Sequence, residues 1–160
     1  MVGWESFFIA QVGASAALAG FVFVAVSINL TKIMSSPRLP GRAFEPLVLL
    51  LALLIVSSLT LVPDQSTTVI GIEVLVVGVV SWLTIGVLLV ESLPDLRSQY
   101  RLYYIQRVAL DQLATLPVIA CGIALLTQGA PGLIWMVPAT VVCFLVVFLD
   151  AWVLLVEINR

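Results

Sequence analysis

A small set of polar and ionisable side chains lies within long apolar stretches of this sequence. The set is Gln11, Asn29, Glu73, Arg107, Asp111 and Asp150. Ionisable groups are costly in hydrocarbon, so they normally face the protein interior or water there and often mark ion or proton pathways. If the chain does chemistry, we therefore expect it to be the binding or movement of ions or protons at these residues.

Helical spacing places several side chains of the first apolar stretch on shared faces. Gln11 and Asn29 are separated by five whole turns at about 3.6 residues per turn, so they lie on one side of a helix. The opposite side carries the small residues Gly13, Ala17, Gly20 and Ser27. Small residues at such spacing let another helix approach closely. We expect a packing face backed by a weakly polar stripe, enclosed by protein or water rather than by lipid.

An inner polar layer is predicted from the later stretches. Arg107 and Asp111 have the i,i+4 spacing of an ion pair. Asp111 and Asp150 both fall about 10 Å inside the same membrane boundary, counted at about 1.5 Å per residue. Asn29 belongs to the same layer by its depth. The cluster is either a neutralised network that fastens two helices or part of an ion or proton pathway.

An outer layer, separated from the inner one by a mostly apolar middle, is predicted to contain Gln11 and Glu73. Glu73 has no basic residue at its own depth. Copies around an axis would bring several Glu73 side chains together, and such a ring binds cations or holds protons. Alternatively, Glu73 is protonated and hydrogen-bonded to Gln11 as a structural tie.

The composition excludes a water-soluble domain. Hydrophobic residues make up 62% of the 160 residues and charged residues only 10%, and the mean hydropathy is +1.21. Too few charged side chains exist to cover a soluble surface, so the lipid bilayer is the expected solvent. The formal net charge of −2 comes with no basic face, which argues against nucleic-acid binding.

Five apolar stretches are each long enough to cross a bilayer, which needs about 20 residues. They lie at about 6–30, 44–63, 67–91, 104–127 and 132–157. We therefore expect an all-α integral membrane bundle of five transmembrane helices, forming a single domain over 1–160. The second stretch has no polar residue from Leu47 to Val56 and is expected to be lipid-facing or purely structural. The fourth helix is expected to begin near Ser92, before the membrane.

Orientation follows from the basic residues, which are retained on the cytoplasmic side of span ends. They are Lys32, Arg38, Arg42, Arg97, Arg101, Arg107 and Arg160. All of them lie in or beside the first and third loops or at the C-terminus. The expected topology therefore has the N-terminus outside and the C-terminus in the cytoplasm.

The residues typical of catalytic and metal sites are scarce. The sequence has no histidine, and its two cysteines, Cys121 and Cys143, fall inside apolar runs where they are expected to fill the core. No serine has a plausible base nearby. We expect no enzyme activity, no catalytic residues, no metal site and no cofactor.

The stretch from Gln11 to Leu30, QVGASAALAGFVFVAVSINL, carries a family resemblance. It is similar to the opening of a family of small bacterial multi-span membrane proteins often labelled modulator of FtsH protease. The likeness covers the first third of the chain and extends through Pro63-Asp64-Gln65. It implies a protein of the bacterial inner membrane, and no catalytic or binding residue is carried over from it.

Two classes of function are favoured. The first is a homo-oligomeric membrane pore or ion channel for monovalent cations or protons, because one chain of this size is too small to enclose a wide path. The alternative is an accessory or scaffold subunit that binds another membrane protein through the small-residue face. A transporter that acts as a single subunit usually has internal repeats, and the sequence offers none.

Overall fold

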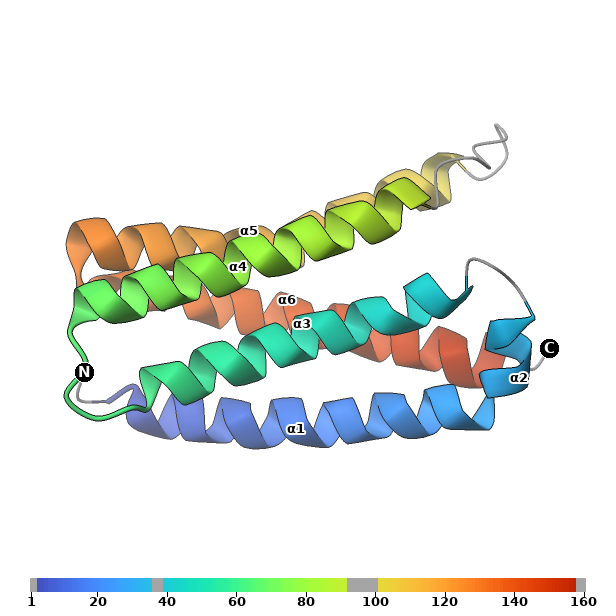
Figure 1. Ribbon diagram of the computed structural model, residues 1–160, viewed down its shortest axis with the longest axis horizontal. Coiled ribbons are helices and arrows are strands. Elements are labelled where there is room, and N and C mark those ends of the chain that lie inside the picture. The colour runs from blue at the N-terminus through green and yellow to red at the C-terminus, as the bar shows by residue number, and fades with distance from the viewer. Residues whose placement is uncertain (1–2, 36–38, 92–100, 158–160) are drawn as a thin grey trace.

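The computed structural model describes residues 3–35, 39–91 and 101–157, and these residues form a bundle of helices (Figure 1). The helices are α1 (Glu5–Ile28), α2 (Leu30–Met34), α3 (Leu39–Thr60), α4 (Thr67–Glu91), α5 (Arg101–Gln128) and α6 (Met136–Trp152). A 3-10 helix, η3 (Ala130–Trp135), precedes α6, and a π-helix, η4 (Val153–Glu157), follows it. The prediction of an all-α fold is confirmed.

Five of the helical segments are long and apolar enough to cross a membrane. They are Glu5–Ile28, Pro40–Thr60, Thr67–Val90, Tyr104–Gln128 and Ala130–Leu155. Large apolar side chains are exposed along them, which in water would be costly and in lipid is the expected arrangement. The number of spans agrees with the sequence prediction, and the chain is a multi-pass membrane protein. The predicted start of the fourth span near Ser92 lies outside the described residues.

Close packing joins the helices in antiparallel pairs. α1 lies beside α3 and α4 beside α5, while α6 packs against both α3 and α5 (Figure 1). The α4–α5 contact is tight at Gly122, where an added Cβ would come within 2.7 Å of the backbone nitrogen of Leu75. Only glycine allows the two backbones to approach this closely.

α3 is the most enclosed of the five spans. Half of its apolar window is buried, against 22% for α1, because α3 contacts α1, α4 and α6. Of the two expectations for this span, lipid-facing or purely structural, the lipid-facing one is wrong, and the structural one stays a prediction. The apolar stretch from Leu47 to Val56 suits lipid and a protein core equally, so the neighbouring helices decide which of the two surrounds it.

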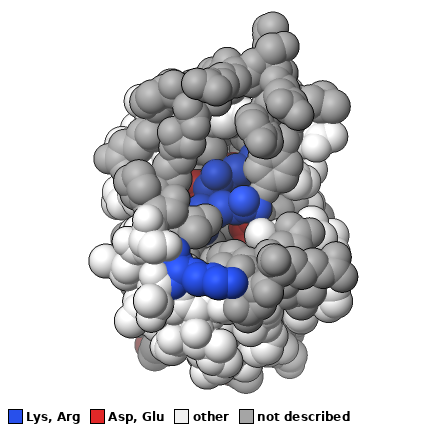
Figure 2. All heavy atoms as spheres, turned by 90° about the vertical axis from the view of Figure 1, so that its right-hand side faces the viewer, with Lys and Arg blue, Asp and Glu red and all other residues white. Residues whose placement is uncertain are grey.

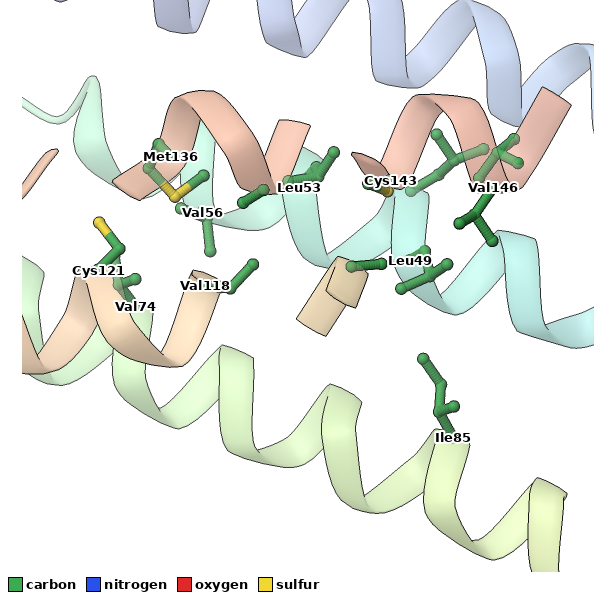
Figure 3. Packing of buried hydrophobic residues seen from close by; sticks show 14 of the residues in the cluster. Leu49, Leu53, Val56, Val74, Ile85, Val118, Cys121, Met136, Cys143 and Val146 are labelled. Atoms are coloured by element: carbon green, nitrogen blue, oxygen red, sulfur yellow. The ribbon is translucent and has the colours of Figure 1, made fainter. Parts of the chain in front are cut away.

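The middle of the bundle is filled by apolar side chains, as the sequence predicted. Figure 3 shows Val56 of α3, Val118 and Cys121 of α5, and Met136 and Cys143 of α6 packed together. Both cysteines are free thiols and buried, which confirms that they are core residues. The acidic and basic side chains of the described residues thus lie toward the two ends of the bundle, while buried hydroxyls such as Ser81 and Thr115 in the middle bond within their own helices.

Candidate functional site

An ion pair joins α5 to α3. Arg107 donates from Nε to Oε2 of Glu45 over 3.0 Å, and its Nη2 donates to the same oxygen. The Glu45 side chain is 1% exposed and that of Arg107 is 16% exposed. The prediction of an Arg107–Asp111 pair within one helix is wrong, because Arg107 reaches across to α3 instead.

A cavity of about 170 Å³ lies beside this ion pair. Its polar lining comes from α3, α5 and α6 and consists of Arg42, Gln106, Arg107, Asp111 and Asp150. Leucine and valine side chains of α5, α6 and η4 complete the wall. The predicted inner cluster of Arg107, Asp111 and Asp150 is therefore brought together, although Asp150 on α6 and Asp111 on α5 are linked through a cavity rather than by a direct contact.

The cavity lies at the end of the bundle where α3 and α5 begin and α6 ends. Figure 2 looks onto this end, where Lys and Arg atoms gather in a central hollow and atoms of Asp or Glu are visible beside them. Lys32, Arg42 and Arg107, the basic residues whose side chains the structure describes, all belong to segments that meet at this end (Figure 1). The middle of the bundle beyond the cavity is the apolar core described above.

Two carboxylate oxygens at this site are buried and have no hydrogen-bond donor among the described residues. They are Oε1 of Glu45 and Oδ2 of Asp111, and the Asp111 residue is only 2% exposed. An ionised carboxylate buried in this way is costly unless a cation or a proton neutralises it. The unpartnered oxygen of Asp111 is therefore the feature of the cavity that most directly indicates a ligand.

Asn29 lies at the same end of the bundle as the cavity but does not line it. Its Nδ2 donates to the carbonyl oxygen of Leu154 over 2.7 Å and to that of Ala25 over 3.3 Å. Leu154 lies in the π-helix η4, so the amide ties the end of α1 to the end of the fifth span. The role of Asn29 is structural in this arrangement.

In the described part of the chain, no hydrogen bond joins the two predicted outer residues, Gln11 and Glu73. Glu73 accepts hydrogen bonds from Nε2 of Gln65, at 3.2 and 3.3 Å, rather than from Gln11. Gln11 is 3% exposed, and neither of its amide atoms has a hydrogen-bond partner among the described residues. Ser15, one turn further along α1, is likewise buried without a partner for its hydroxyl. The predicted Gln11–Glu73 tie is therefore wrong.

A second cavity, of about 430 Å³, lies at the opposite end of the bundle, where α1 begins and α3 ends. It is lined by the start of α1 and by the end of α3 with the loop that follows, including Trp4, Phe8, Thr60 and Gln65. Gln65 therefore connects the cavity to Glu73, which is half-buried on α4. Glu73 thus lies toward the end of the bundle at which α4 begins.

The small-residue face of α1 is uncovered within the chain. Gly13, Ala17, Gly20 and Ser27 are all exposed, and an added Cβ at Gly13 or Gly20 would meet nothing within 4 Å. It is the polar stripe that packs: Gln11, Ser15 and Val22 are buried, and α3 is the helix in closest contact with α1. The two faces thus have the reverse of their predicted roles inside one chain, and packing against a second protein stays a prediction.

Sequence reasoning missed Glu45, the residue on which the ion pair depends, and Arg42. Glu45 could have been found from the sequence, because a carboxylate just inside the second span needs a partner in a low-dielectric setting. What the sequence alone did not reveal is that α5 would supply that partner.

Comparison of the chain with protein-family models, with curated proteins and with solved structures finds no match. The function is therefore argued from the geometry of the site.

Proposed function

We propose that this chain assembles with copies of itself into a membrane pore for monovalent cations or protons. The observation that carries the proposal is Asp111, whose buried carboxylate has an unpartnered oxygen and lines a cavity at one end of the bundle. An intramembrane carboxylate of this kind attracts positive charge. The cavity would collect the ion or proton at the mouth of the pathway.

The expected position of the pathway is between copies rather than through one chain. In the described part of the chain, the apolar core of α3, α5 and α6 fills the middle of the bundle beyond the cavity. A route through one copy would require that core to open, whereas a route between copies would use outward-facing side chains. Glu73, half-buried near the opposite end, is the acidic group that such a route would pass.

The basic end of the bundle, with the cavity, is proposed to face the cytoplasm, because Lys and Arg beside span ends are retained on that side. The N-terminus would then be outside and the C-terminus inside. The resemblance of the first helix to a bacterial membrane-protein family supports the bacterial inner membrane as the location.

The test is ion flux in liposomes that contain purified, assembled protein, followed with a membrane-potential dye. We expect flux above that of empty liposomes, reduced by Asp111→Asn and changed in selectivity or pH dependence by Glu73→Gln. Asp64→Asn is the matched control, since it removes an exposed loop carboxylate and should leave flux unchanged. The mass of the detergent-solubilised complex should correspond to a ring of copies. A monomer, or assembled protein without flux, would contradict the pore.

The accessory-subunit function is the second candidate, and the open face of α1 favours it. Gly13 and Gly20 leave room for a close helix contact that no described part of the chain fills. Gly13→Leu with Gly20→Leu should then release a co-purifying membrane-protein partner while the thermal midpoint is unchanged. Gly86→Leu on α4, which also meets open space, is the control. A partner retained by the double variant would exclude this face as its binding surface.

A further inference from the structure

The charges around Asp111 do not balance if every group is ionised. The facing charged side chains are Arg42 and Glu45 on α3, Arg107 on the same helix as Asp111, and Asp150 on α6. The α4 sequence from Val74 to Val90 contributes no ionisable side chain. Among the side chains that the structure describes, three carboxylates therefore face two guanidinium groups, which leaves one excess negative charge in a membrane-spanning site.

Asp111 is the carboxylate that would carry this excess negative charge. Glu45 already binds Arg107 through Oε2, and Asp150 is only half-buried at the cavity wall. Asp111 is 2% exposed, and no side chain or backbone group in the described part of the chain donates to its Oδ2. Leaving a charge buried and unpaired is far more costly than neutralising it.

A proton fits the site better than a metal ion. Metal cations need several oxygen ligands that converge on one point. In the part of the chain that the structure describes, no three acidic or cysteine side chains are placed to hold a metal ion. A proton needs one carboxylate oxygen and an acceptor for the resulting O–H, and the nearby unpartnered Oε1 of Glu45 is an acceptor of that kind.

We propose that Asp111 is the proton-carrying residue of the cavity, neutral in the resting protein while Glu45 stays ionised against Arg107. The remaining charges of Arg42, Glu45, Arg107 and Asp150 then sum to zero. Release breaks the O–H bond of Asp111, transfers the proton to water in the cavity and leaves one net negative charge. This inference rests on the proposed function for its physiological meaning, because it names the proton as the species that the cavity takes up.

The first test compares amide substitutions, because an asparagine has the shape of a neutral aspartic acid. Asp111→Asn should keep the thermal midpoint of the parent in detergent, since it replaces one neutral group by another. Glu45→Gln should lower the midpoint by several degrees, since it removes the partner of Arg107. If Asp111→Asn melts as low as Glu45→Gln, Asp111 is ionised in the folded protein and the proposal is overturned.

The second test observes the proton by infrared spectroscopy, without measuring flux. At neutral pH the parent protein should show a carboxylic-acid C=O band that Asp111→Asn lacks and Asp150→Asn retains. Equal bands in the parent and in Asp111→Asn would overturn the assignment. The assignment would also be overturned if sodium raised the thermal midpoint of the parent but not that of Asp111→Asn, because a metal cation would then be the ligand. If the infrared band is present but the liposomes show no flux, the protonation of Asp111 is supported and only the proposed pore is contradicted.

Discussion

Arg107 of α5 binds Glu45 of α3, 62 residues earlier in the chain, rather than Asp111 on the next turn of its own helix. The pair joins the helix that is most enclosed to the helix that carries the cavity wall. Because Arg107 binds Glu45, Asp111 is left as a buried carboxylate with an unpartnered oxygen. The stability of the site and its proposed chemistry therefore both depend on the pairing of Arg107 with Glu45.

Glu45→Gln is predicted to destabilise the protein by about 3–5 kcal/mol, because it leaves the Arg107 guanidinium without its charged partner in a low-dielectric site. Replacing both residues, Glu45→Gln with Arg107→Met, should recover most of the loss. Unfolding in detergent, followed by tryptophan fluorescence, measures both variants. Parent-like unfolding of Glu45→Gln would mean that water solvates the pair.

Gly122→Ala is predicted to destabilise the bundle by about 1–3 kcal/mol, because the new methyl group overlaps the backbone of α4 at Leu75. Gly86→Ala is the matched substitution on α4, where a Cβ meets open space, and it should be neutral or stabilise by up to about 1 kcal/mol through helix propensity. The same unfolding assay compares them. Equal stabilities would show that α4 and α5 are not in close contact at Gly122.

A cysteine that replaces Ser66 or Gln128 is predicted to react with an impermeant thiol reagent added from outside. A cysteine that replaces Ser35 is predicted not to react. All three positions are exposed in the structure, Ser66 and Gln128 at one end of the bundle and Ser35 at the other (Figure 1). The native Cys121 and Cys143 are buried, so the background should be low. Labelling of position 35 from outside in intact cells would invert the proposed orientation.

Asn29→Ala is predicted to loosen the end of the fifth span, since it removes the donor to the carbonyl oxygen of Leu154. An unsatisfied buried carbonyl costs about 1–3 kcal/mol. Hydrogen exchange of residues 150–157 should become faster, while exchange in α4 stays unchanged. Ser27→Ala is the control, because the exposed hydroxyl of Ser27 bonds only within α1, to the carbonyl of Phe23. Unaltered exchange near Leu154 would show that the amide does not hold η4.

Much of the candidate site follows from local sequence rules. Counting along helices correctly placed Asp111 and Asp150 at one level, because the rise per residue of a helix is nearly constant. The same rule put Gln11 on the side of α1 that proved to be buried. It failed for the partners of Arg107 and Glu73, since spacing along one helix says nothing about which neighbouring helix presents a better hydrogen-bonding group.

The sequence by itself determined the class of protein and its elements: five apolar spans, an apolar middle, and polar groups toward the ends. Those features depend on hydrophobicity and helix length, which are properties of local segments. Only the tertiary structure decided that α3 lies inside, that Glu45 neutralises Arg107, and that the small-residue face of α1 stays open. Lipid and a helix neighbour are almost equally apolar, so the sequence pattern does not distinguish them, and close packing and polar contacts between helices set the arrangement.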